Sequence, residues 1–451
     1  MKRLKYTYHL LTTLALLMMS LGGCVQDENL PSHIQEETEE TRTTLLLSIS
    51  MPTVQTKANL TELPGTDKEN LLKRITLFLI GDGGVKTYTL PVNEPQSPLT
   101  FYIANESGTR QIYAAANMTD AQIAAVKGAA DRNPVIDISN IADITGDNGF
   151  LMTAQATDEN LNKNITIRSG TINRAQAKLD RVMSKVLLTC VTDDNSYIQL
   201  SAESKGYIKL SDVRYALETT NRKFFPFTKA GNEDPNYSMT ATLGQAPGNF
   251  FTYQGSVETD GNIATKHDAG RMSNGSGNPY TEGIYCLENT SNSDYGFGND
   301  LSIPKSVATY LKIAAKFTPK YIDDTNELGE TQAKAKLAAD GTFYTCRKAP
   351  TGYKHICYSS VQAGIAFFNG LGYTFSAEDF IAHTGGWQYY ETFVSSPVSF
   401  TEEANLKRNH YYIVNVTSMT APVQEKTIEV NTTIADWIVK GKTTIEIETN
   451  N

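Results

Sequence analysis

Cys24 has the clearest chemical signature in the chain. The N-terminus begins with a basic stretch (residues 2–5), continues with an apolar run (residues 10–21) and closes with Leu21-Gly22-Gly23-Cys24. This is the layout of a secretory signal peptide, and the run is too short for a spanning helix. A cysteine directly after Leu-Gly-Gly looks like a bacterial lipobox, which predicts residues 1–23 as a lipoprotein signal peptide and Cys24 as the lipid-bearing first residue. The alternative is an ordinary signal peptide with an incidental cysteine.

The stretch after Cys24 is acidic and has no apolar periodicity. Asp27 and Glu28 come first, four glutamates follow within residues 36–40, and Pro31 lies between them. Such a segment buries too little apolar area to offset its ordering entropy, so we expect a tether. It resembles the acidic signal that directs lipoproteins to the cell surface, and a merely solvating linker is the alternative. With lipid on Cys24, we expect the protein to be attached to the cell outer membrane under either interpretation of this stretch.

Four further cysteines could carry redox or metal chemistry: Cys190, Cys286, Cys346 and Cys357. No C-x-x-C spacing occurs, so the usual signatures of zinc and thioredoxin sites are missing. Cys346 and Cys357 flank a turn between two short β-like runs, so they could meet across a hairpin. An exported protein permits that disulfide, and two buried free thiols are the alternative.

The sequence offers no recognisable catalytic or cofactor set. Its six histidines are scattered, and neither a Gly-x-Ser-x-Gly motif nor a phosphate-binding glycine loop occurs. Acidic turns such as residues 323–327 could hold Ca²⁺, but solvated turns favour the same residues, so we expect no metal and no cofactor. A net charge of −9 argues against a nucleic-acid partner. We therefore expect a protein that is not an enzyme.

Most of the secondary structure that the sequence predicts consists of strands in which apolar and polar residues alternate. In residues 44–51 (TLLLSISM), Leu45, Leu47, Ile49 and Met51 share one face, which predicts a half-buried strand. The chain ends on similar patterns, with Ile445 and Ile447 alternating with polar residues in 443–448, and Ile428 and Val430 in 427–434. A terminal strand without a partner in its own domain would be a template for another chain.

Many short strands with turn signals predict an all-β protein built from β-sandwiches. Its 451 residues suit two domains and a tether. We expect a propeptide at 24–57 with the tether and first strand, and an N-terminal β-sandwich domain at 58–188. The C-terminal β-sandwich domain would cover 189–451, with one or more terminal strands in 427–449.

Several local patterns together resemble the type V pilins of Bacteroidales, the fimbrillin families. They cover nearly the whole exported chain: LKRITLFL at 72–79, IYAAAN at 112–117, FLMT at 150–153, RAQAKL at 174–179, YCLENT at 285–290, ATYLKI at 308–313, KRNHYY at 407–412 and Asp436-Trp437. The resemblance implies that both domains are transthyretin-like sandwiches.

The resemblance also implies a mode of assembly called donor-strand exchange. A surface protease cuts after the first strand, that strand leaves, and the C-terminal strand of another pilin subunit fills the groove by β-strand addition. In this chain the removable strand would be 44–51, with Leu45, Leu47, Ile49 and Met51 as plugs. The donor would be 443–448 with Ile445 and Ile447 as plugs, extended by Ile428 and Val430 if 427–434 takes part.

The processing position is where this chain departs from the family. An arginine-specific protease would cut just beyond the first strand, but the matching residues here are Lys57 and Ala58. The nearest arginine upstream is Arg42, and a cut there would release the lipid while leaving the strand in place. If neither bond is cut, the subunit keeps its lipid and strand, as the family's membrane-anchor subunits do.

Two kinds of protein thus fit the sequence. The first is a structural subunit of a surface fimbrium, exported as a lipoprotein, polymerised after proteolysis and supporting adhesion. Its partners would be other pilin subunits, fimbrial anchor or tip proteins, the outer membrane and a surface protease. The second is a non-polymerising surface lipoprotein that binds a glycan or an adhesin partner, or the anchor subunit of the fimbrium.

Overall fold

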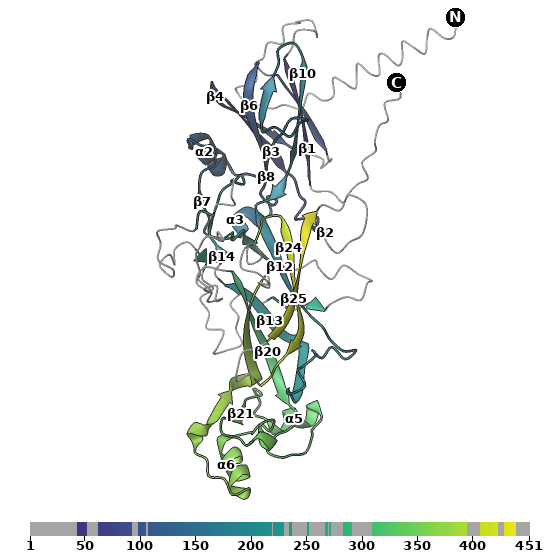
Figure 1. Ribbon diagram of the computed structural model, residues 1–451, viewed down its shortest axis with the longest axis vertical. Coiled ribbons are helices and arrows are strands. Elements are labelled where there is room, and N and C mark those ends of the chain that lie inside the picture. The colour runs from purple at the N-terminus through teal and green to yellow at the C-terminus, as the bar shows by residue number, and fades with distance from the viewer. Residues whose placement is uncertain are drawn as a thin grey trace, which may run out of the picture.

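The protein is all-β, as predicted, with its strands gathered into sheets along an elongated molecule (Figure 1). The computed structural model describes residues 43–51, 62–92, 98–104, 107–218, 220–229, 234–236, 250–251, 267–268, 270–271, 283–290, 309–394, 406–422 and 428–438. In this part of the chain, no helix is long and apolar enough to cross a membrane.

The N-terminal strands form two sheets that share one hydrophobic core. The first has three strands in the order β10 (Ile172–Lys178), β1 (Thr44–Ser50) and β5 (Leu99–Ala104). The second runs β11 (Asp180–Arg181), β8 (Met152–Gln155), β6 (Gly108–Ala116), β3 (Arg74–Gly81) and β4 (Gly84–Pro91), and β9 (Asn164–Ile167) also pairs with β6.

Two further sheets enclose a second core. One runs β18 (Gly270–Arg271), β12 (Met183–Cys190), β24 (His410–Met419), β25 (Ile428–Ile438) and β2 (Glu62–Pro64), and β19 (Ile284–Leu287) also pairs with β12. The other runs β17 (His267–Asp268), β13 (Gly206–Glu218), β20 (Tyr310–Pro319) and β23 (Trp387–Phe393). We call these two sheets the second group of sheets. β11 still pairs with the N-terminal strands and β12 pairs within the second group, so the change falls at Val182, slightly before the domain boundary that we expected after residue 188.

Three two-stranded ribbons complete the β-structure. They join β14 (Thr220–Asn221) to β16 (Phe250–Phe251), β15 (Lys223–Phe224) to β7 (Ile136–Asp137), and β21 (Phe343–Cys346) to β22 (Phe380–His383). The second of these ribbons links the N-terminal part of the chain to the segment that follows β13.

Short helices connect the strands. The α-helices are α2 (Asp120–Gly128), α3 (Ala142–Thr145), α5 (Glu330–Lys336) and α6 (Val361–Gly370), and the 3₁₀ helices are η5 (Thr351–Tyr353), η6 (Ala377–Asp379) and η7 (Thr384–Gly386). The sequence analysis did not predict the helices α5 and α6, which lie at the end of the molecule opposite β10 (Figure 1). Thr119 and Gln122 form a capping box at the start of α2, and Ser360 caps α6.

Candidate strand-acceptor groove

β1 is the central strand of its sheet although it comes first among the described strands. It pairs parallel with β10, where Leu47 lies opposite Ala175, and antiparallel with β5, where Leu47 lies opposite Phe101. Backbone bonds also tie its ends, from the Leu179 N–H to the Ser50 carbonyl oxygen at 2.8 Å and from the Thr44 N–H to the Thr171 carbonyl oxygen at 3.2 Å. Removing β1 would therefore leave open backbone partners on both β5 and β10.

The apolar face of β1 is fully enclosed. Leu45 and Leu47 are 0% exposed, Ile49 is 1% exposed and Met51 is 5% exposed, while the residues between them are half-buried. The predicted burial of these four side chains is confirmed, because a strand alternates its side chains between the two faces of a sheet. Their release from the groove stays a prediction.

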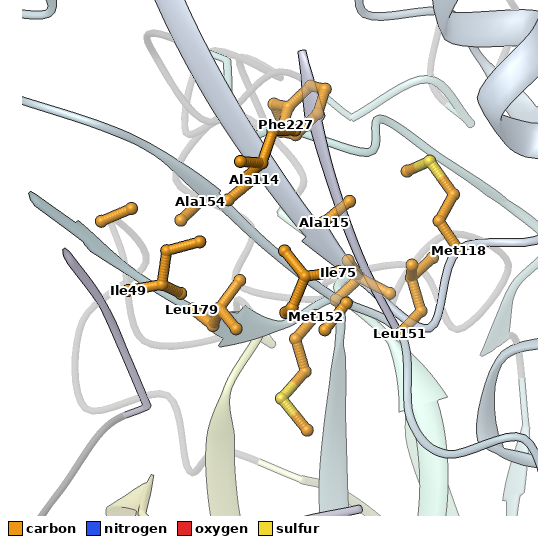
Figure 2. Close-up of a cluster of buried hydrophobic side chains, with 14 of the residues drawn as sticks. Ile49, Ile75, Ala114, Ala115, Met118, Leu151, Met152, Ala154, Leu179 and Phe227 are labelled. Atoms are coloured by element: carbon orange, nitrogen blue, oxygen red, sulfur yellow. The ribbon is translucent and has the colours of Figure 1, made fainter. Parts of the chain in front are cut away.

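The floor beneath β1 is the facing sheet, and many of its side chains are small. Strand register places one continuous apolar face there: Ile75, Leu77, Leu79, Ile112, Ala114, Ala116, Met152 and Ala154. Figure 2 shows Ile49 in this cluster with Ala154 and Leu179. The leucine and isoleucine side chains of β1 belong to the same buried cluster as this face, so close packing of this core depends on a strand in that position.

The two walls of the groove differ in size and polarity. β5 contributes larger side chains, since Phe101 lies opposite Leu47 and Ile103 opposite Leu45. On the β10 side, Ala177 lies opposite Ile49 and Asn173 lies opposite Leu45. The Asn173 amide donates to the carbonyl oxygen of Arg168 at 3.0 Å, so this side chain organises the turn before β10.

The free energy gained by burying the apolar side chains of residues 45–51 is comparable to the free energy of unfolding of a whole domain. Burying one Leu- or Ile-sized side chain contributes about 1.5–3 kcal/mol, so four contribute roughly 6–12 kcal/mol. Ordinary domains are stable by about 5–15 kcal/mol in total. A chain that loses β1 must therefore gain another strand in the same place or lose much of its N-terminal fold.

A buried ion pair fixes the chain just after β2. The Lys185 ammonium donates to Glu69 Oε1 at 2.7 Å, and both side chains are 1% exposed or less. Burial by itself would raise the pKa of Glu69, but Lys185 and the Tyr285 hydroxyl outweigh it and hold that pKa below its ordinary value. Lys185 also lies 4.8 Å from the centre of the Tyr411 ring. Because Lys185 is on β12, this pair ties the segment before β3 to the second group of sheets.

Arg181 reinforces the same junction from β11. Its guanidinium donates to the Glu69 carbonyl oxygen at 3.2 Å and to the side-chain oxygens of Asn70 and Asn409. Burial lowers the pKa of Arg181 to about 10, which leaves it charged at neutral pH. The sequence analysis missed this network, although a lysine within the apolar run MSKVLLTC (residues 183–190) is a signal that could have indicated it.

The predicted donor residues at the C-terminus divide into two groups. Ile428 and Val430 lie on β25, which pairs along its length with β24, so that Ile428 is opposite Met419 and Val430 opposite Val416. Their use as donor plugs stays a prediction, and it would require this pairing to open. Ile445 and Ile447 lie outside the described residues, as do Cys24, Arg42, Lys57 and Ala58.

Of the two alternatives for Cys346 and Cys357, the structure has the second: both are buried free thiols, and the hairpin disulfide is not formed. Tyr344 forms an antiparallel bridge with Tyr358. Because side chains alternate between faces, Cys346 shares the face of Tyr344 and Tyr358, and Cys357 lies on the opposite face. The two cysteines accordingly belong to different core clusters. Burial raises the pKa of both thiols, which suppresses their reactivity.

The other chemical candidates have structural roles. Asp324 accepts hydrogen bonds from Thr325 and Asn326 within its own turn. No group of three or more His, Cys, Asp or Glu side chains is arranged to hold a metal ion within the described residues.

Comparison with known proteins gives matches at the level of structure alone. No protein-family model matches the chain, and no curated protein matches it in sequence. Among solved structures it is similar to a fimbrilin from Porphyromonas gingivalis, with 14% identity, a TM-score of 0.46, and coverage of 90% of this chain and 100% of that chain.

Two further solved structures extend this comparison. A tip fimbrial protein of Porphyromonas gingivalis has 13% identity and a TM-score of 0.42, with coverage of 88% and 99%. A fimbrial assembly protein of Parabacteroides distasonis has 8% identity and a TM-score of 0.35, with coverage of 86% and 99%. These are the kinds of protein that the sequence resemblance named. Likeness at this level describes at most the fold, so the role of this chain has to come from its own residues.

Proposed function

We propose that the protein is a structural subunit of a surface fimbrium that supports adhesion and polymerises by strand exchange. The observation that carries this proposal is β1: it is the first described strand, it lies at the centre of a sheet, and its three buried side chains, with Met51 just after it, belong to the N-terminal core. Residues 52–61 connect β1 to β2, and the Lys57–Ala58 bond lies within that connection.

Cleavage between Lys57 and Ala58 separates β1 from the rest of the chain while leaving the remainder anchored. β2 pairs with the end of β25, where Glu62 is opposite Asp436, and the Glu69–Lys185 ion pair follows it in sequence. The trimmed chain thus keeps its new N-terminal segment tied to the second group of sheets. After the cut, pairing with β5 and β10, backbone bonds at its two ends and core contacts hold β1 without a covalent link, so another strand that makes the same contacts can replace it.

The C-terminal segment supplies the replacement in this proposal. Residues 443–448 alternate Ile445 and Ile447 with polar residues, which matches the two-residue repeat of the groove. Lipid on Cys24 would hold the precursor at the outer membrane until the cut, and trimmed subunits would join the extracellular fibre. A chain that is never cut would keep β1 and its lipid, and would serve as an anchor or as a non-polymerising surface lipoprotein.

The test is to cut the exported chain in the 52–61 connection and follow both the β1 peptide and the size of the product. Strand exchange predicts loss of the peptide containing Leu45–Met51 together with a ladder of detergent-resistant oligomers. A chain ending at residue 442 is the matched variant, and it should lose the ladder but remain susceptible to the cut. If trimmed full-length chains stay monomeric with β1 retained, the proposal is wrong.

A further inference from the structure

The two middle positions of the groove favour a particular pair of side chains. At Leu47 and Ile49 the β10 wall consists of Ala175 and Ala177, which leave space for branched aliphatic groups. The end position at Leu45 differs, because the polar Asn173 lies beside it. A donor strand with two branched residues separated by one position would thus place them at 47 and 49.

The outer edge of the β10 wall carries two cations. The register places Arg174 beside Leu46 and Lys178 beside Ser50, and both basic residues are exposed. Neither has an ion-pair partner among the residues that the structure describes. Burial raises the pKa of nearby Asp180, and the positive charge of Lys178 opposes that rise. The outward face of β1 itself, with Leu46, Ser48 and Ser50, offers these cations no charge.

The C-terminal segment has the complementary pattern. In residues 443–449 (TTIEIET), Ile445 and Ile447 are separated by one position, and Glu446 and Glu448 point to the opposite face of an extended strand. Suppose that Ile445 and Ile447 occupy the positions of Leu47 and Ile49 and that the donor strand runs in the same direction as β1. Glu446 would then lie beside Gln176, and Glu448 would lie beside Lys178. That direction preserves the parallel pairing with β10 and the antiparallel pairing with β5.

We propose that Lys178, at the outer edge of the β10 wall, selects the acidic outward face of residues 443–449 from a second copy of this chain. Ile445 and Ile447 take the positions of Leu47 and Ile49, and Glu448 pairs with Lys178. This inference rests on the proposed strand exchange and specifies its partner, register and direction. It also favours replacement of β1 over its return, because the incoming strand gains an ionic contact with Lys178 that the neutral β1 lacks.

The experiment measures peptide binding to the trimmed chain after β1 has been displaced. The probes are a labelled peptide of residues 441–451, its Glu448→Lys form and a peptide of residues 43–52 as reference. An exposed ion pair contributes about 0.2–1 kcal/mol, and reversal replaces attraction by repulsion of similar size, so Glu448→Lys should weaken binding by roughly 2- to 30-fold at low salt. The difference should shrink as ionic strength rises.

A charge swap identifies the partner of Glu448. The Lys178→Glu chain should bind the wild-type peptide more weakly and regain affinity for the Glu448→Lys peptide. Its affinity for the 43–52 peptide should not change, since Ser50 is neutral, and this control shows that the groove is intact. Lys127→Glu on α2 is a matched surface reversal that should leave the affinity for all three peptides unchanged.

The outcomes separate this inference from the proposed function. Equal binding of the wild-type and Glu448→Lys peptides overturns the selection by charge and leaves strand exchange standing. Rescue of the Glu448→Lys peptide by Arg174→Glu instead of Lys178→Glu overturns the proposed direction. If the 43–52 peptide binds and the wild-type 441–451 peptide does not, the C-terminal segment is not the donor, and strand exchange between copies fails with it.

Discussion

Leu47→Ala is the perturbation that probes the groove most directly. Leu47 is 0% exposed and lies between Phe101 and Ala175, whose backbones are held in place by strand pairing on both sides. A site of this kind cannot collapse around a missing side chain. Core Leu→Ala changes cost about 2–5 kcal/mol, and the cost grows with the cavity that remains, so we expect a value in the upper half of that range.

Native-state hydrogen exchange with mass spectrometry measures this loss locally. Peptides from β1, β5 and β10 should lose protection together, because opening the groove exposes all three strands at once. A loss of about 3.5–5 kcal/mol corresponds to a factor of roughly 400–5,000 in protection, and the protection of β24 should stay unchanged.

The matched control is Leu46→Ala on the same strand. Leu46 points to the outer face and is half-buried, so its truncation should cost well under half as much. Equal losses from Leu46→Ala and Leu47→Ala would refute the reasoning, as would a loss at β1 that leaves β5 and β10 protected.

Three further predictions concern charges and thiols elsewhere in the chain. Glu69→Gln leaves the Lys185 ammonium buried without its counter-ion and should lower the free energy of unfolding by about 3–5 kcal/mol in urea titrations, whereas Glu327→Gln at the exposed Lys320 pair should cost under about 1 kcal/mol. For Glu69 the folded-state pKa is lowered, so the stability from this pair is present above the carboxyl's ordinary pKa and is lost as the pH falls through the folded-state value. Burial raises the pKa of Asp234 to about 6, so this carboxyl favours the folded state at low pH and loses that contribution as pH rises from about 4 to 6; Asp234→Asn should flatten stability across that window. Cys190, Cys286, Cys346 and Cys357 should react with a thiol reagent only after unfolding, and non-reducing mass spectrometry should find no Cys346–Cys357 bond.

Local periodicity was enough to predict the strand that fills the groove. The alternation in residues 44–51 specified which four side chains in and just after β1 are buried, because a strand exposes its two faces in turn. The neighbours of β1 could not be predicted in the same way. β10 lies more than a hundred residues away in the sequence, and nothing in either segment alone specifies that they pair in parallel.

The structure differs from the expectation where local patterns were ambiguous. The short apolar run at 355–359 reads as a strand, but it forms only isolated bridges beside the helical group of α5 and α6. The Cys346–Cys357 disulfide failed for a related reason, since a register change of one residue moves a side chain to the opposite face. The Glu69–Lys185 pair joins residues far apart in sequence, and only the burial of a charged residue within β12 hinted at it.

The central claim is that a strand from another copy of the chain replaces β1. Cryo-electron microscopy of fibres recovered from the cell surface tests it most directly. Our account predicts that the strand between β5 and β10 is continuous with the end of β25 of a neighbouring subunit, with Ile445 and Ile447 in the positions of Leu47 and Ile49. Density in which residues 44–50 still occupy that position and remain connected to β2 of the same chain would contradict it.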